Sequence, residues 1–196
     1  MTIYAFADLA GGSLAFVASQ DQLVFGPAIA AASLRFATSG TDLLVMAAGE
    51  VLRLTNLSLG GGGLNPGNLV FQDGSQFFLD SITSSLRSGG SGHDWFAVDR
   101  GGADSILGAA GDDWIEAGST LDADDRLAGG AGTANRLAVS GSLSVTLAAA
   151  TVTGIETIEL RDGTIVLSLL VAAAATATPE AGAFFTVDAT PQGIGS

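Results

Sequence analysis

The sequence predicts an all-β protein in which a flattened parallel β-solenoid, or β-roll, follows an antiparallel, β-rich N-terminal unit. Apolar residues two positions apart recur through the first half of the chain, as in strands with one buried face. Residues 89–132 form a glycine- and aspartate-rich repeat, and strand-like alternation resumes after it. We therefore divide the chain into residues 1–86 as a capping or assembly unit, residues 87–137 as the repeat tract, and residues 138–196 as further coils and a cap.

The N-terminal unit is predicted to contain about seven strands. Its apolar pairs are Leu14/Phe16, Leu23/Phe25, Leu34/Phe36, Leu43/Val45, Leu52/Leu54, Leu69/Phe71 and Phe77/Leu79. The dipeptide Asp73-Gly74 has the composition of a type I′ hairpin turn. This stretch holds no histidine, cysteine or pair of glutamates for acid–base catalysis, so we expect no enzymatic activity. We expect its strands to cover the N-terminal end of the solenoid.

Composition restricts the function classes. A net charge of −13 excludes a nucleic-acid binder that works through phosphate contacts. With 47% hydrophobic and only 14% charged residues, the chain is not generally disordered. It has no cysteine, and therefore neither disulfides nor a thiolate metal site. Nine of the twenty acidic residues fall within residues 94–125, so the negative field is concentrated on the repeat tract and favours cations.

Each repeat unit joins a glycine-rich turn to one aspartate and to a large apolar residue two positions later. These pairs are Asp94/Phe96, Asp104/Ile106, Asp113/Ile115 and Asp125/Leu127. The glycines let carbonyl oxygens converge, and the apolar residue points from a three-residue strand into a narrow core. Two units make one coil, which places Asp94 and Asp113 on one edge and Asp104 and Asp125 on the other. A flexible acidic linker would not repeat this apolar spacing.

The pattern Gly-Gly-x-Gly-x-Asp-x-U-x, with U a large apolar residue, resembles the calcium-binding nonapeptide of the repeats-in-toxin (RTX) proteins. The specific motif covers about a quarter of the chain. Weaker phrases at Asn68 to Ser75 and Val152 to Ile158 resemble segments of RTX-bearing bacterial surface-layer and adhesin proteins. The resemblance implies about two or three bound Ca²⁺ ions, and an extracellular or cell-surface location reached through type I secretion.

Physical chemistry supports a cation at these turns. Carboxylates on adjacent coils would lie about 4.8 Å apart and repel by about 3.5 kcal/mol at an effective dielectric of 20. Calcium accepts irregular sets of oxygen ligands better than magnesium does. We predict one site at Asp94 with Asp113, a second at Asp104 with Asp125, and a weaker third at Asp113 with carbonyls of the Gly129 turn. The last unit lacks its aspartate, because Ala134 stands at that position. The predicted ligands are Asp94, Asp104, Asp113, Asp125, Gly89, Gly90, Ser91, Gly92, Gly101, Gly102, Gly108, Ala110 and Gly111.

Two tryptophans follow the aspartate in units two apart. Trp95 and Trp114 should therefore stack on one outer face of adjacent coils. They predict either an exposed contact surface, for example for a cell-surface polysaccharide, or a cross-coil pair that stiffens the sheet. His93 is the single histidine and is expected to be a solvent-facing turn residue, since one imidazole makes neither a zinc site nor a catalytic dyad.

Targeting signals are sparse. Met1 to Ala10 lacks the positive region and apolar core of a Sec signal peptide. The apolar run Ile165 to Ala177 is too short to span a bilayer comfortably, and is expected to form a buried strand followed by a helical turn at Ala172 to Ala177. Thr190 to Ser196 shows no obvious type I secretion signal, which indicates a fragment of a longer protein or an atypical one.

These features predict a calcium-binding, non-catalytic structural protein. We expect the roll to be unfolded at low cytosolic calcium, and to fold outside the cell and support self-association into a surface layer, filament or adhesin. Its main partner is then another copy of the chain, in a homo-oligomer or polymer. Two alternatives stay open: a secretion and folding module of a larger secreted enzyme, and a module that binds a glycan or peptide.

Overall fold

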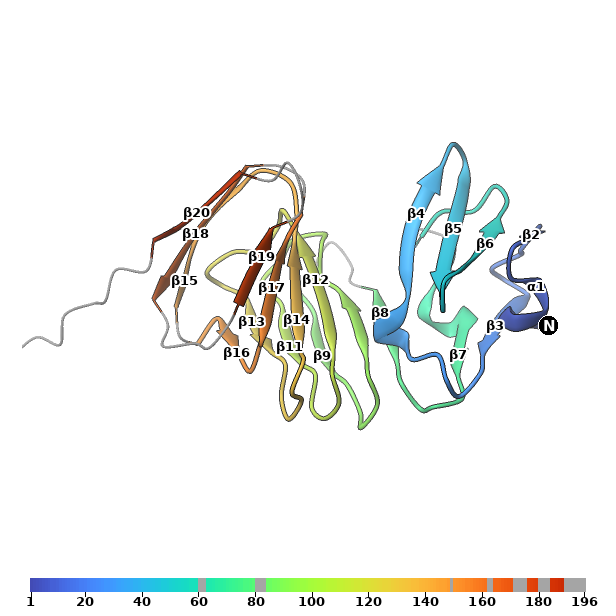
Figure 1. Ribbon diagram of the computed structural model, residues 1–196. Helices are drawn as coiled ribbons and strands as arrows, with labels where there is room; N and C mark the ends of the chain where they lie inside the picture. Colours follow the sequence, from blue (N-terminus) through green and yellow to red (C-terminus); the bar gives the residue numbers. More distant parts are fainter. Residues whose placement is uncertain are drawn as a thin grey trace, which may run out of the picture.

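The computed structural model describes residues 1–59, 63–79, 84–148, 150–161, 164–170, 176–179 and 184–188. Its helical elements are one short helix, α1 (Phe6–Leu9), and the 3-10 turns η1 (Ala31–Ser33) and η2 (Pro66–Asn68). The strands are β1 (Thr2–Ala5), β2 (Ser13–Leu14), β3 (Asp21–Phe25), β4 (Arg35–Ser39), β5 (Asp42–Ala47), β6 (Glu50–Leu54), β7 (Leu69–Phe71), β8 (Phe77–Leu79), β9 (Leu86–Ser88), β10 (Trp95–Ala97), β11 (Ser105–Leu107), β12 (Trp114–Gly118), β13 (Arg126–Ala128), β14 (Arg136–Val139), β15 (Leu143–Ala148), β16 (Val152–Thr153), β17 (Thr157–Leu160), β18 (Thr164–Leu170), β19 (Thr176–Pro179) and β20 (Phe184–Asp188). Figure 1 shows a stack of coils with the N-terminal unit at one end.

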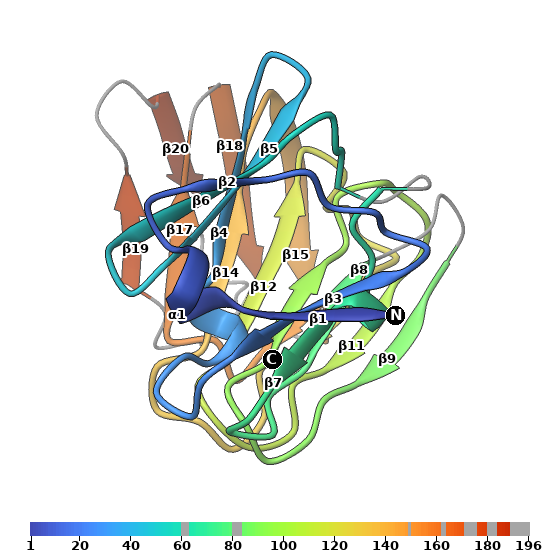
Figure 2. The same ribbon diagram turned by 90° about the vertical axis from the view of Figure 1, so that its right-hand side faces the viewer.

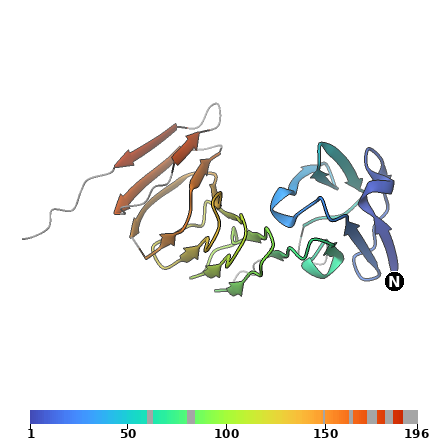
Figure 3. The ribbon, with the colours of Figure 1, turned by 60° about the horizontal axis from the view of Figure 1, so that its bottom comes forward.

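The predicted parallel solenoid is confirmed. One wall is a six-stranded sheet in the order β19-β17-β14-β12-β10-β8, and the opposite wall is the sheet β16-β13-β11-β9. Neighbouring strands within both walls are parallel, so successive coils lie side by side, as Figure 3 shows from green to orange. Because β8 already pairs with β10, the stacking of coils extends N-terminally of residue 87.

A third parallel sheet, β15-β18-β20, joins the C-terminal coils. β15 and β18 are longer than the three-residue strands of the repeat tract and pair over six residues. In this part of the sequence, alternating apolar runs such as Leu143 to Leu147 replace the glycine-rich turns. Each coil therefore has a strand where the coils of the repeat tract have a turn. Thr176 and Ala177 lie in strand β19, which corrects that part of the expected helical turn; residues 171–175 and 190–196 lie outside the described part of the chain.

The solenoid is filled by the apolar residue of each repeat unit. Phe96, Ile106, Ile115 and Leu127 are at most 1% exposed, as predicted. The register aligns them across coils: Phe96 faces Ile115, which in turn faces Leu137. The first coil continues this column, because the rings of Phe78 and Phe96 stack with centroids 4.8 Å apart.

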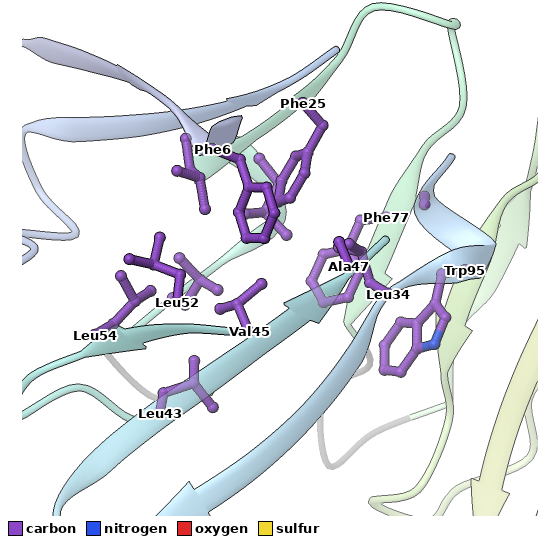
Figure 4. Close-up of a cluster of buried hydrophobic side chains, with 14 of the residues drawn as sticks. Phe6, Phe25, Leu34, Leu43, Val45, Ala47, Leu52, Leu54, Phe77 and Trp95 are labelled. Carbon is purple, nitrogen blue, oxygen red and sulfur yellow. The ribbon is translucent and has the colours of Figure 1, made fainter. Parts of the chain in front are cut away.

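The N-terminal unit consists of two small sheets. The antiparallel expectation is confirmed for β4-β5-β6, to which β2 adds in parallel. β1, β3 and β7 instead form a parallel sheet, because the chain crosses to the other sheet between them rather than turning back beside each strand. The rings of Phe6 and Phe71 flank Phe25, with centroids 5.2 and 4.9 Å from its own. Figure 4 shows Phe6 and Phe25 side by side in this core.

The Asp73-Gly74 turn does not form the predicted hairpin. It connects β7, which pairs with β3, to β8, which pairs with β10 in another sheet. A type I′ turn needs two residues with positive φ, whereas only Gly74 has one, at +84°. Phe77 lies beyond the turn and stacks on Trp95 at 4.7 Å, so β8 gains more contact in the solenoid than beside β7.

The N-terminal unit lies against the first coils (Figure 2). Phe36 of β4 contacts both Phe77 and Trp95, with ring centroids 5.3 and 5.6 Å away. In η1, Ala32 donates a backbone hydrogen bond of 2.9 Å to the His93 carbonyl. These contacts join the unit to the end of the solenoid and to the outer face of its larger wall.

The inward apolar residues of the coils should contribute most to the free energy of unfolding. Ile115 is fully buried, so Ile115→Ala should lower the free energy of unfolding by about 2–5 kcal/mol. Leu107 is 47% exposed and lies on an outer face, so Leu107→Ala should cost only about 0.5 kcal/mol. Urea unfolding followed by circular dichroism compares the two, and equal losses would contradict the assignment of inner and outer faces.

Candidate functional site

The coils bring the predicted aspartates together on two edges. The backbone N–H of Asp94 donates to Asp113 Oδ1 at 2.8 Å, and that of Asp104 donates to Asp125 Oδ1 at 2.9 Å. All four side chains are at most 3% exposed. The predicted pairing of Asp94 with Asp113 and of Asp104 with Asp125 is therefore present in the fold.

On the first edge, a side-chain oxygen from each coil accepts a hydrogen bond from the backbone of the coil before it. The acceptors are Asp94 Oδ1 from Gln76 N at 2.6 Å, Asp113 Oδ1 from Asp94 N at 2.8 Å, Asn135 Oδ1 from Asp113 N at 2.8 Å, and Glu156 Oε2 from Asn135 N at 2.7 Å. We call this series the edge ladder. It satisfies the N–H groups that the short strands leave free at the turns.

Two members of the edge ladder are absent from the predicted ligands. Asn135, rather than Ala134, occupies the aspartate position of its coil, because the preceding turn is one residue longer there. Glu156 takes the same position in the next coil. The sequence contains a signal that identifies Asn135: it precedes the inward residue Leu137 by two positions, as Asp94 precedes Phe96.

The second side-chain atom differs from step to step. Asp94 Oδ2 accepts from Gly90 N at 2.7 Å, and Asn135 Nδ2 donates to the Gly154 carbonyl at 3.0 Å. Asp113 Oδ2 is buried and has no hydrogen-bond partner among the described residues. A β-carbon added to Gly108 would collide with both Asp113 Oδ2 and the Gly129 carbonyl oxygen, so these two acceptors both lie close to the Gly108 Cα.

Burial controls the ionisation of this edge. Desolvation raises the pKa of Asp113 to about 7, and the nearby charge of Asp94 adds to the rise. Desolvation also raises the pKa of Asp94, against the opposing effect of its hydrogen bonds from Gly90 and Gln76. A proton or a metal cation at Asp113 would remove the conflict between its carboxylate and the Gly129 carbonyl.

The glycine turns stack closely beside the edge ladder. Ala110 donates its backbone N–H to the Gly90 carbonyl at 3.1 Å, which aligns the Gly89–Gly92 turn with the Gly108–Gly111 turn. Gly111 has φ +108°, and a β-carbon there would collide with the Gly92 carbonyl. Ser91 lies exposed in the first of these turns. The turns thus present a row of closely spaced carbonyls.

The second edge is built differently. Asp104 Oδ1 accepts from Ser85 N at 2.8 Å, and Asp125 Oδ2 accepts from Asp122 N at 2.9 Å, so both oxygens of Asp125 are hydrogen-bonded. Desolvation raises the pKa of Asp125. Gly101 and Gly102 have φ +83° and +113° and shape the turn before Asp104. The nearest atoms to a β-carbon on Gly101 would be those of the Thr120 side chain, at 3.9 Å, so no carbonyl converges there.

The tryptophans do not form an exposed surface. Trp95 and Trp114 are in register on the outer face, as predicted, but are only 3% and 2% exposed. Phe36 of β4 packs edge-on to Trp95, and the Arg35 guanidinium lies 3.5 Å from the Trp114 ring centre. The prediction of an exposed contact surface is therefore wrong, because β4 of the N-terminal unit covers this face. His93 is a turn residue with a side chain 51% exposed, as predicted.

No protein-family model, curated protein or solved structure matches this chain. The fold and the edge ladder define a parallel β-solenoid with buried acidic side chains at its turns. In the described part of the chain, no helix has the length and apolar character needed to cross a membrane. The same residues contain no group of three or more histidine, aspartate or glutamate side chains arranged to hold a metal ion.

Gly111→Ala should destabilise the turn by about 2 kcal/mol or more, since it adds both a positive-φ penalty and a collision with the Gly92 carbonyl. Gly67→Ala is the matched control, because a β-carbon there has no neighbour within 4 Å. Thermal unfolding measures both variants. Equal melting temperatures would show that the turns are not packed as described.

Without metal, stability should fall as pH rises from about 4 to about 7, because folded Asp113 retains a proton that the unfolded chain has already lost. Asp113→Asn should remove this part of the pH dependence and stabilise the chain at pH 7.5, because an amide at this step can donate to the Gly129 carbonyl as Asn135 does to Gly154. The folded fraction, followed by circular dichroism in chelator from pH 5 to 8, tests both effects even where much of the wild-type chain is unfolded.

Asp112→Asn provides the control for this pH experiment. The pKa of Asp112 is lowered, chiefly by a hydrogen bond from Thr133 N, so its contribution is lost only at acidic pH. Its substitution should leave the slope between pH 5 and 7 unchanged. A wild-type slope that persists in Asp113→Asn would overturn the assignment.

Proposed function

We propose that this chain is a calcium-binding, non-catalytic extracellular structural protein of the RTX kind, whose coils fold when Ca²⁺ binds at the turns. One observation carries the proposal: the buried Asp113 Oδ2 has no donor among the described residues, and it lies with the Gly129 carbonyl oxygen beside Gly108. Two acceptors in this arrangement attract a cation. The resemblance of the repeat tract to the RTX nonapeptide supports calcium as that cation.

The available donors suit calcium. Asp113 Oδ2 and the Gly129 carbonyl oxygen would be the nearest protein ligands of an ion. Asp94 would join them only by giving up a hydrogen bond from Gln76 N or Gly90 N. Hard oxygen donors in irregular positions match the six to eight ligands and flexible geometry of Ca²⁺. Asp104 with Asp125 is the weaker candidate for a further ion, since backbone N–H groups already occupy both oxygens of Asp125.

Binding and folding would be coupled. Buried carboxylates disfavour the folded state at neutral pH, and a bound cation reverses this, so part of the binding energy becomes folding energy. Extracellular modules bind calcium at about 10⁻⁴ to 10⁻³ M. The acidic chain would therefore remain unfolded at low cytosolic calcium, pass through a type I exporter, and fold at the cell surface.

The architecture supports the proposal of self-association. A stack of parallel coils ends in strands with unpaired backbone groups, which pair readily with another copy unless they are covered. The N-terminal unit covers one end of this solenoid, so assembly would use the other end or the lateral edges. A net charge of −13 opposes contact between copies, and bound calcium reduces that repulsion. A surface layer, a filament or an adhesin fits this behaviour.

Calcium titration of the purified chain tests the proposal, with ion stoichiometry from equilibrium dialysis and folding from circular dichroism. Wild type should bind with a midpoint of about 0.1–1 mM. Asp113→Asn should bind one ion fewer and fold with less dependence on calcium. Asp112→Asn removes the same charge one residue away, where the side chain is 39% exposed, and should keep the wild-type stoichiometry.

Light scattering during the same titration tests assembly. Particles that form with calcium and dissolve with chelator support the structural role. Folding without assembly would favour a secretion and folding module of a larger enzyme. A chain that neither binds calcium nor changes its fold with it would overturn the proposal.

A further inference from the structure

A groove of about 310 Å³ lies between β4 and the outer face of β10 and β12, away from the edge ladder. Arg35 and Phe36 form one side, while Trp95, Glu116 and Arg161 line the floor and the far side. None of the predicted cation ligands takes part in its lining. Its volume lies at the lower end of the range for small-molecule sites, about 300–1,000 Å³, and suits a ligand of one or two rings.

The groove concentrates positive charge in a strongly acidic chain. Three of the seven arginines, Arg35, Arg100 and Arg161, line it. Arg161 is neutralised by Glu116 at 2.9 Å and by Glu159 at 3.3 Å. Arg35 makes no ion pair with any described residue; its Nη1 donates instead to the carbonyls of Ala32 and Leu34, at 2.9 and 2.6 Å. Arg35 thus has no direct salt-bridge partner among the described residues, although the charges of Glu159 and Glu116 act on it from farther away.

Arg35 and Arg161 also repel one another. Both guanidinium groups lie over the ring of Trp114, at 3.5 and 5.1 Å from its centre. Burial, and then the charge of Arg161, lower the pKa of Arg35. An anion bound beside Arg35 would relieve both the desolvation and the repulsion.

The unpaired buried polar atoms in this region are all donors. Trp95 Nε1, Trp114 Nε1 and Arg161 Nε are buried and have no acceptor among the described residues. These donor atoms are buried, so what the groove offers to a ligand is the charge of Arg35 and Arg100. Glu116 and the exposed Asp99 at its rim can in turn accept hydrogen bonds from ligand hydroxyls.

We propose that this groove binds a sugar acid, a small ring that carries one carboxylate and several hydroxyls. The carboxylate pairs with the free edge of the Arg35 guanidinium, and the apolar face of the ring contacts Phe36 and Trp95. The ligand is a free sugar acid or the terminal unit of an acidic polysaccharide, since both present the same chemistry. The groove and the edge ladder use different residues.

Isothermal titration calorimetry of the full chain in calcium tests this, with glucuronate as the probe. Glucuronate should bind saturably, while glucose and acetate should bind at least about tenfold more weakly, because each lacks one half of the recognised chemistry. Arg35→Gln should weaken glucuronate binding about 10- to 100-fold through loss of a charge-assisted hydrogen bond. Arg87→Gln, at an exposed position on β9, should leave it unchanged.

A second variant separates binding from folding, because Arg35 also packs on Trp114. Ala37 is exposed and lines the groove, so Ala37→Glu should block the carboxylate without disturbing the core. Ala7→Glu places the same charge on an exposed residue of α1 and should bind like wild type. A disaccharide with terminal glucuronate separates the sources: if it binds as tightly as free glucuronate, the ligand is a polysaccharide end, and if it does not, the ligand is a free sugar acid. Absence of saturable binding, equal affinity for glucose or acetate, or unchanged affinity in Ala37→Glu would overturn the proposal.

Discussion

Hydrogen bonds from the backbone of one coil to a buried acidic or amide side chain of the next hold this solenoid in register. Three-residue strands offer few backbone hydrogen bonds, and every coil must turn before and after each strand. The N–H group just before the strand would otherwise be buried without a partner. The oxygens of Asp94, Asp113, Asn135 and Glu156 supply that partner on one edge, and those of Asp104 and Asp125 on the other. The side chain two positions before each inward apolar residue therefore has a structural role in joining the coils, whether or not it also binds a cation.

The edge ladder also explains why one step differs from its neighbours. Asp94 satisfies its second oxygen with Gly90 N, and Asn135 carries its own donor to the Gly154 carbonyl. Asp113 Oδ2 receives no hydrogen bond of either kind. Ala109 takes the place of Gly90 in this turn, but it lies in the left-handed region at φ +77° and its N–H does not donate to Asp113 Oδ2. Among the buried carboxylate oxygens of the described residues, only Asp113 Oδ2 thus lacks a donor, so the need for a proton or cation is greatest there.

Local sequence patterns predicted the parts of this fold that depend on local spacing. The apolar residue two positions after each aspartate located the core column, and the paired spacing assigned the aspartates to two edges. Asn135 was missed because one extra residue in its turn moved it out of the nine-residue frame, although its distance to Leu137 was preserved. The burial of Trp95 and Trp114 could not be predicted, since it depends on β4, about sixty residues away from Trp95 in the sequence. The hairpin predicted at Asp73-Gly74 was wrong for a similar reason. The composition of the turn fits a hairpin, but the strand after it packs through Phe77 on aromatic residues of the solenoid, which are distant in sequence.

The contacts that dock the N-terminal unit begin at the edge ladder itself. Gln76 N donates to Asp94 Oδ1, Ala31 N donates to the Ser75 hydroxyl at 2.8 Å, and Ala32 N donates to the His93 carbonyl. Any ligand that orders the Asp94 turn therefore also stabilises the docked position of η1 and of β4 directly after it, and docking stabilises the turn to the same extent. The groove exists only while β4 is docked, because Arg35 and Phe36 form one of its sides. The turn and the groove are separate in their chemistry but share one scaffold, so the state of the acidic edge sets how well the groove is formed.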